Sequence, residues 1–238
     1  MSRCLLPALP LATAHYVLDL GSGTGELLRD LQAATPQATV IGVDRSEDML
    51  RVARRFRDWP MVVMDAQLLA LRHEMFDVAV MAFVLHMLAD PLASLSAVRC
   101  VLRRGGTVGI VTWGEQVMSP GRDFWREELD ACGAVSDPDA SNAQRTLANT
   151  SEKLRQLLEA AALVPMQVWT DHFTQRWTVD GLVALRFSCD PPLKRLASLS
   201  PDAQTSCRAR VEERLRALTP EELVFRPEVL FAVAHRPA

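Results

Sequence analysis

Several features that mark other protein classes are scarce or missing in this chain of 238 residues. It has a single tyrosine, 6% aromatic residues and five cysteines, none of which forms a Cys-x-x-Cys pair. An odd, unpatterned set of cysteines argues against a disulfide framework or a zinc site and is typical of reduced thiols in the cytoplasm. We therefore expect a cytoplasmic protein without a metal centre.

The chain also has no excess of basic residues and no long apolar run. Lys and Arg number 26 against 29 Asp and Glu, which gives a formal net charge of −3. Nucleic-acid binding relies on clustered cations that neutralise phosphates, so we expect no nucleic-acid partner. No apolar run approaches the about 20 residues of a membrane span. The run from Cys4 to Ala14 imitates a weak secretory signal, but Pro7 and Pro10 interrupt it.

Apolar segments alternate with amphipathic segments along the first half of the chain. Short strands are expected at 17–20, 39–44, 61–65, 76–81 and 107–113, and helices at 25–34, after Ser46, and from Asp90 to about Leu102. Strands that are apolar throughout and alternate with helices predict an α/β fold whose parallel sheet is covered on both faces.

The second half is expected to be less regular. Residues 114–150 are expected to form a long loop that serves as a lid, with one helical segment near 124–129. A helix capped by Ser151, a strand over 164–170, helices over 181–199 and 201–218 and a last strand over 229–234 follow. We predict one domain over 1–238, with a core at 16–113, the loop at 114–150 and a C-terminal part with inserted helices at 151–238.

A glycine-rich turn joins the first expected strand to the first helix. The stretch from Asp19 to Gly25 reads Asp-Leu-Gly-Ser-Gly-Thr-Gly. A strand, a glycine turn and a helix N-terminus let a nucleotide-sized ligand approach the main chain closely. A dinucleotide fingerprint needs a small residue where this chain has Glu26, so the spacing disfavours a dinucleotide.

Three acids, Asp19, Asp44 and Asp65, stand at the C-terminal ends of successive expected strands. Ligands of open α/β sheets bind at these ends, so the carboxylates should converge. Asp44 can accept hydrogen bonds from both ribose hydroxyls, and Asp65 with the main-chain N–H of Ala66 can bind adenine. An adenosine with a short polar tail and no phosphates, which describes S-adenosylmethionine, satisfies all three. Singly, each acid is also a common turn or cap residue.

These motifs resemble those of the class I S-adenosylmethionine-dependent methyltransferases, in the branch of the ubiquinone and menaquinone methyltransferases. The matching segments are motif I at 17–25, the acidic second strand at 41–44, the adenine segment at 64–66, motif IV at 76–86 and the turn at 102–106. The resemblance implies a Rossmann-like, doubly wound, seven-stranded and mostly parallel sheet with an antiparallel last strand, plus a C-terminal helical insertion.

The resemblance also implies which residues bind the cofactor. Motif I would contribute Asp19, Gly21, Ser22, Gly23 and Gly25, with Asp19, Gly21 and Gly23 around the methionine part. Asp44 would hold the ribose with Met49 or Arg45 packing nearby, Asp65 and Ala66 would hold adenine, and Met81 with Ala82 would flank the amino group or sulfonium.

His86 is the candidate catalytic residue. It follows the fourth expected strand, and a histidine can act as a general base near neutral pH. The alternative, which we favour, is a packed residue that shapes the pocket.

The predicted activity is in-line methyl transfer to an O, N or C atom of a small-molecule acceptor, which leaves S-adenosylhomocysteine. Positioning of donor and acceptor would supply most of the rate. Only 16 residues precede Val17, which leaves that side of the expected site open. A homodimer is one way to cover it. A binding module for S-adenosylmethionine with little or no turnover is the alternative function.

Overall fold

The computed structural model describes residues 1–56, 59–115, 121–135, 146–188 and 192–238. The chain divides into two compact units, each assembled from separate segments. The first unit consists of residues 1–115, 143–171 and 228–238, and the second of residues 116–142 and 172–227. Within the described ranges, no helix is both long and apolar enough to cross a membrane.

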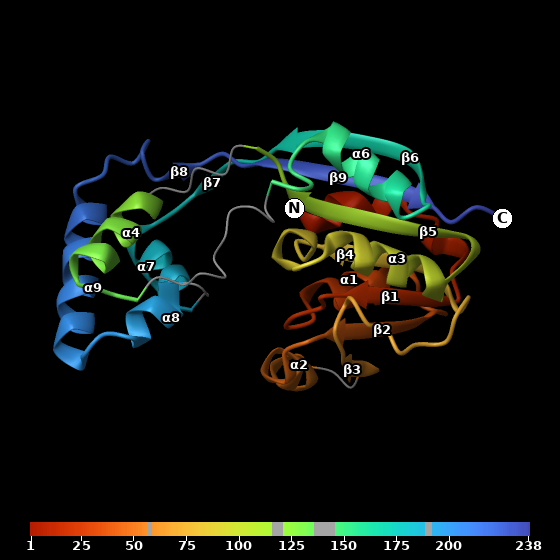
Figure 1. Ribbon diagram of the computed structural model, residues 1–238, viewed down its shortest axis with the longest axis horizontal. Helices are drawn as coiled ribbons and strands as arrows, with labels where there is room; N and C mark the ends of the chain where they lie inside the picture. Colours follow the sequence, from red (N-terminus) through yellow and green to blue (C-terminus); the bar gives the residue numbers. More distant parts are fainter. Residues whose placement is uncertain (57–58, 116–120, 136–145, 189–191) are drawn as a thin grey trace. The chain divides into compact units, whose positions relative to one another are not determined.

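The first unit is built on a seven-stranded sheet, which Figure 1 shows with its helices. The strands follow the order β3-β2-β1-β4-β5-β9-β6. Their bounds are β1 (Tyr16–Leu20), β2 (Thr39–Asp44), β3 (Met61–Val63), β4 (Phe76–Ala82), β5 (Leu102–Trp113), β6 (Val164–His172) and β9 (Glu228–His235). Strands β1 to β5 pair in parallel, whereas β9 is antiparallel to β5. The predicted Rossmann-like sheet with an antiparallel last strand is confirmed.

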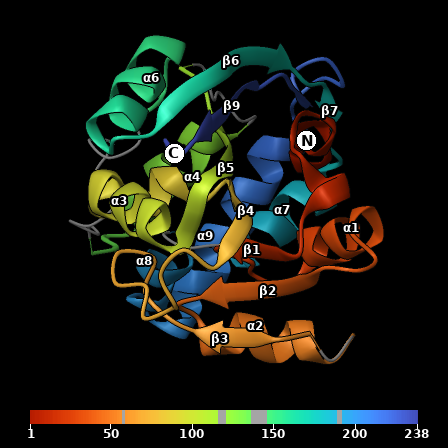
Figure 2. The same cartoon turned by 90° about the vertical axis from the view of Figure 1, so that its right-hand side faces the viewer.

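Helices cover both faces of this sheet. Figure 2 shows α3 and α6 on one face, and α1 with the N-terminal 3-10 helix on the other. The helices of the first unit are α1 (Glu26–Ala34), α2 (Glu47–Arg54), α3 (Pro91–Val101) and α6 (Ser151–Ala160), with 3-10 helices η1 (Ser2–Ala8), η2 (Leu11–Thr13) and η3 (Leu85–Met87).

Side-chain caps set where these helices begin. Ser46 and Asp90 accept hydrogen bonds from the N–H groups of Met49 and Ala93, as the sequence predicted. The helix expected to be capped by Ser151 is instead capped one residue earlier, because the Thr150 hydroxyl accepts from the N–H of Lys153.

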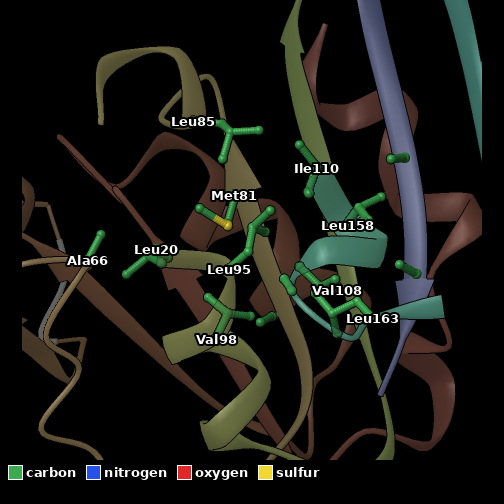
Figure 3. Packing of buried hydrophobic residues seen from close by; sticks show 14 of the residues in the cluster. Leu20, Ala66, Met81, Leu85, Leu95, Val98, Val108, Ile110, Leu158 and Leu163 are labelled. Atoms are coloured by element: carbon green, nitrogen blue, oxygen red, sulfur yellow. The ribbon is translucent and has the colours of Figure 1, made fainter. Parts of the chain in front are cut away.

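A single apolar core fills the space between the sheet and helices α3 and α6. Leu20 and Met81 from the sheet pack with Leu95 of α3 and Leu158 of α6, as Figure 3 shows, and all four are fully buried. Burial of each such side chain contributes about 1.5–3 kcal/mol relative to exposure. This core holds the central strands rigidly, and with them the loops that follow their C-terminal ends.

The fifth strand begins earlier than expected. The sequence predicted a turn at Gly105 and Gly106 before residue 107, whereas β5 starts at Leu102 and contains both glycines. Phe76 pairs with Leu102 and Val78 with residue 107, so the glycines lie in an irregularity of the ladder. Gly105 has φ +72°, and a Cβ at Gly106 would lie 2.8 Å from the carbonyl oxygen of Arg103, so two glycines suit this bulge.

The second unit is mainly helical and supplies the expected C-terminal helical insertion. It contains α4 (Arg122–Ala131), α7 (Val179–Ser188), α8 (Pro192–Ala197), α9 (Pro201–Arg216) and a two-stranded sheet of β7 (Gln175–Arg176) and β8 (Val224–Phe225). The single helix expected over 181–199 is two helices, and the second begins at Pro192. Residues 189–191, between the two helices, lie outside the described ranges.

Candidate functional site

Asp19 lies in the middle of the sheet. Its neighbours across β2 and β4 are Gly42 and Val80, and the residue is 2% exposed. Its Oδ2 atom is buried without a hydrogen-bond partner. Burial, and after it the negative charge of Asp44, raises the pKa of Asp19 to about 7. The carboxyl group is therefore poised to gain from a cationic group placed beside it.

The glycine loop after β1 turns through three left-handed residues, Gly21, Gly23 and Gly25, with φ of +77°, +53° and +81°. A Cβ at Gly21 would lie 2.6 Å from Val84 Cγ2. A Cβ at Gly23 would meet no atom within 4 Å, so its main chain faces open space. The loop thus packs tightly at Gly21 and leaves room for a ligand at Gly23.

Asp44, the last residue of β2, holds this loop in place. Its Oδ2 accepts from the N–H of Gly23 at 2.8 Å, and its Oδ1 accepts from the N–H of Ser46 at 2.8 Å. A carboxylate offers about four acceptor positions, so both oxygens can still accept from ribose hydroxyls. The structure brings Asp19, Asp44 and the glycine loop together, as the sequence predicted.

Ser22 and Gly25 occupy the inner side of the loop. Ser22 is 8% exposed, and its Oγ is buried without a hydrogen-bond partner. A Cβ at Gly25 would lie 3.2 Å from Cβ of Ala53 and 3.3 Å from the ring of Trp59. Their placement makes them residues that shape the loop, and Ser22 keeps a hydroxyl available to a ligand.

The residues expected around the ribose and adenine are more exposed. Arg45 and Met49 lie at the surface beyond β2, and Met49 is 46% exposed. Asp65 is exposed on the loop after β3, which ends at Val63 and not at residue 65 as predicted. The Asp65 carboxylate accepts from the N–H of Gln67 at 2.8 Å. It therefore closes a local turn and keeps acceptor positions toward solvent.

Ala66 and Met81, unlike the exposed Asp65 and Met49, are buried. Ala66 is buried against the core, which leaves its main chain as the polar group near Asp65. The Met81 side chain is fully buried in the core beside Leu20 and Leu85 (Figure 3). Met81 pairs with Ile110 in the ladder between β4 and β5, and Ala82, the last residue of β4, is half-buried.

Three residues at the ends of β4 and β5 were not recognised in the sequence. Phe83 has φ +56°, unusual for a bulky residue, and its ring lies 4.3 Å from that of Trp113 between centroids. Val84 closes over Gly21. The backbone strain at Phe83 and the contact of Val84 with Gly21 cannot be predicted from the neighbouring sequence. Trp113 could have been singled out, because an aromatic residue at the end of a strand can line a binding site.

His86 lies in η3, immediately after the strained turn. It is half-buried, and its ring is edge-on to Trp113 with centroids 6.4 Å apart. The structure thus places His86 with Phe83 and Trp113 in one aromatic cluster. A ring held in this way can shape a pocket wall or take up a proton.

A separate cavity of about 260 Å³ is lined by His73, Glu74, Arg99, Cys100 and Arg236. Two of these residues come just before β4, so the cavity lies at the N-terminal ends of the parallel strands. The glycine loop lies at their C-terminal ends. The Arg236 guanidinium donates to the Glu74 carboxylate at 2.7 Å and to the carbonyl oxygen of Leu102 at 2.7 Å. Arg236 thus ties the chain after β9 to the residues before β4, and this cavity is not the cofactor site.

The first-unit residues fit an adenosine ligand with a cationic, phosphate-free tail. An unpartnered buried carboxylate oxygen at Asp19, open space at Gly23 and a fixed acceptor at Asp44 are the features such a ligand needs. Among the described residues, no group of three or more His, Cys, Asp and Glu side chains could hold a metal ion.

Comparison with known proteins agrees with this geometry. The family described as "Methyltransferase domain" matches residues 18–110. A demethylmenaquinone methyltransferase of Thermotoga maritima is 35% identical over 96 residues, which are 40% of this chain and 42% of the relative. The matched region thus spans less than half the length of that curated relative.

Two solved structures share the fold at lower identity. A Bacillus halodurans protein described as a methyltransferase is 19% identical, with TM-score 0.62, covering 99% of this chain and 98% of its own. An N-methyltransferase of Haemonchus contortus, solved with phosphomonomethylethanolamine and S-adenosylhomocysteine, is 21% identical with TM-score 0.56, covering 99% of this chain and 52% of its own. Residues 18–110 thus match a methyltransferase domain and are similar in sequence to demethylmenaquinone and ubiquinone/menaquinone C-methyltransferases.

Proposed function

We propose that this chain binds S-adenosylmethionine at the glycine loop and transfers its methyl group to a small-molecule acceptor. The observation that carries the proposal is the hydrogen bond between the N–H of Gly23 and the Asp44 carboxylate, beside open space at Gly23. A fixed acceptor next to an uncovered stretch of main chain suits a ribose and its short tail. Residues 1–238 would act as one methyltransferase, in the cytoplasm.

The proposed roles follow from the chemistry of each group. Asp44 accepts from the ribose hydroxyls, and Asp65 with Ala66 contacts adenine. Asp19, Gly21, Ser22, Gly23 and Gly25 surround the methionine part, Met81 and Ala82 contribute main chain beside it, and Met49 or Arg45 packs near the ribose. When bound, the cofactor supplies an electrophilic methyl group on a positively charged sulfur.

The protein's own contribution is positioning. In favourable cases, correct alignment of two reactants supplies about 7–11 kcal/mol of the barrier. Phe83, His86 and Trp113 form the wall that lies nearest the end of β4, so we place the acceptor against them. His86 either accepts a proton from the acceptor or holds the wall in shape. Of the loop expected over 114–150, residues 116–120 and 136–145 lie outside the described ranges. A second copy of the chain is the proposed partner, in a homodimer.

A transfer assay tests this function. The full chain is incubated with S-adenosylmethionine that carries a deuterated methyl group, together with a panel of phenols, amines and quinols. We expect S-adenosylhomocysteine and a labelled product with one class of acceptor. Binding of the cofactor without transfer to any acceptor would instead support a binding module, and failure to bind it would overturn both functions.

A further inference from the structure

The second unit contains two cysteines that face each other across two helices. Cys132 follows the last residue of α4, and Cys207 lies on α9, which packs against α4 (Figure 1). Cys207 is fully buried, and Cys132 is half-buried against the same apolar cluster. Both are free thiols. The two sulfurs therefore share one interface, with Cys132 on its accessible side.

Arg210 connects this pair to its surroundings. It lies three residues after Cys207, so the two side chains project from the same face of α9. Its Nη2 donates to Cys132 Sγ at 2.7 Å, while its Nε donates to Glu128 Oε2 at 2.6 Å. A guanidinium held against a cysteine sulfur in a partly exposed position is an environment in which thiols react with oxidants.

The two cysteines differ in exposure, which sets the order in which they react. Burial, and after it the charge and thiol of Cys132, raises the pKa of Cys207 to about 11. Cys207 thus stays a thiol in the reduced protein, whereas Cys132 is the sulfur that a small oxidant can reach. The two side chains are within hydrogen-bonding reach of each other in one apolar cluster, which makes Cys207 the partner for an oxidised Cys132.

The pair also has a particular place in the chain. The second unit is assembled from residues 116–142 and 172–227, and Cys132 belongs to the first segment and Cys207 to the second. Noncovalent contacts now join the segments, among them Arg195 with Asp130 at 2.5 Å and Arg214 with Glu127 at 2.6 Å. A covalent bond between the cysteines would fasten α4 to α9.

We propose that Cys132 and Cys207 form a reversible disulfide, which a peroxide makes and a dithiol reductant breaks. Cys132 sulfur attacks one peroxide oxygen, the O–O bond breaks, and the thiol proton leaves with the departing oxygen as water. Cys207 sulfur then attacks the sulfenic sulfur, the S–O bond breaks, and a second water carries away the Cys207 proton. Two thiols lose two electrons in total, and the peroxide gains them.

Peptide mapping of the full-length protein tests the bond directly. After treatment with hydrogen peroxide and alkylation, trypsin releases Cys132 in residues 127–145 and Cys207 in residues 196–208. We expect these two peptides to be linked, and to separate when dithiothreitol is added. Cys132→Ser and Cys207→Ala should abolish the link, whereas Cys4→Ser and Cys100→Ser should leave it unchanged. Circular dichroism establishes that each variant is folded.

A rate measurement separates a reactive pair from two cysteines that merely pack. Arg210→Gln should slow formation of the linked peptides several-fold, because it removes the cation beside Cys132. Arg216→Gln, which breaks an ion pair with Glu212 on the same helix, is the matched control and should react like the wild type. The proposal is overturned if Cys4 and Cys100 oxidise while Cys132 and Cys207 stay alkylatable, if either one pairs with Cys189, or if Arg210→Gln reacts at the wild-type rate.

Discussion

The main-chain nitrogen of Gly23 and Oδ2 of Asp44 are 2.8 Å apart, and their hydrogen bond ties the loop after β1 to the end of β2. The other carboxylate oxygen receives the N–H of Ser46, where α2 is capped. One side chain therefore fixes the glycine loop and the start of the next helix. Any ligand held by Asp44 is positioned relative to the loop as well.

Replacement of Asp44 should weaken cofactor binding more than it weakens the fold. In Asp44→Asn the amide nitrogen cannot accept, so the N–H of Gly23 or of Ser46 loses its partner. We expect the Kd for S-adenosylhomocysteine to rise at least about tenfold, or about 1.4 kcal/mol. Calorimetric titration measures it. Asp48→Asn, which removes an exposed acid on α2, is the control, and equal affinities in the two variants would contradict the role of Asp44.

Gly21 should tolerate no side chain. Gly21→Ala adds a Cβ at 2.6 Å from Val84 and puts a non-glycine residue at φ +77°. We expect a loss of about 2–4 kcal/mol of stability, of which the left-handed backbone accounts for about 1–2 and the overlap for the rest. Urea unfolding measures it. Gly133→Ala, at φ +72° with no atom within 4 Å, should show the backbone cost alone, and an equal loss in both variants would contradict the contact.

Asp19 should make the free energy of unfolding depend on pH. Its pKa is about 7 in the folded chain and about 3.9 in an unfolded one. Between these values the folded state keeps a proton that the unfolded state has lost, so the folded state is favoured at low pH and stability falls as pH rises from about 4 to about 7. In Asp19→Asn this fall should be smaller. Urea unfolding at a series of pH values tests it, and identical slopes in both proteins would refute it.

A variant of His86 distinguishes a role as general base from a role in shaping the wall of the pocket. If it shapes the wall, as we favour, His86→Gln raises the KM for the acceptor several-fold and leaves the pH dependence of kcat unchanged. Loss of the acidic limb of the kcat profile would instead identify a general base. The affinity for S-adenosylhomocysteine serves as the internal control, because the proposed cofactor residues do not include His86.

The sequence predicted most of the sheet and the convergence of Asp19, Asp44 and the glycine loop. The approach of Asp19 and Asp44 to each other was predictable, because parallel strands place their C-terminal ends on one side of the sheet. The helix caps at Ser46 and Asp90 were also predictable, because capping depends on residues only a few positions apart.

Features that depend on distant neighbours were not predictable. Nothing near Met81 in the sequence shows that its side chain belongs to the core. The left-handed Phe83 and the packing of Val84 on Gly21 arise from the meeting of β4 with the glycine loop.

Titration of S-adenosylhomocysteine and of NAD into the wild-type chain and Gly23→Ala tests the central claim most directly. The alanine methyl group would occupy the open space at Gly23, so the variant should remain folded, with only the backbone cost of φ +53°. We predict that the wild type binds S-adenosylhomocysteine but not NAD, and that Gly23→Ala binds neither. Binding of NAD by the wild type, or undiminished binding of S-adenosylhomocysteine by folded Gly23→Ala, would contradict the account.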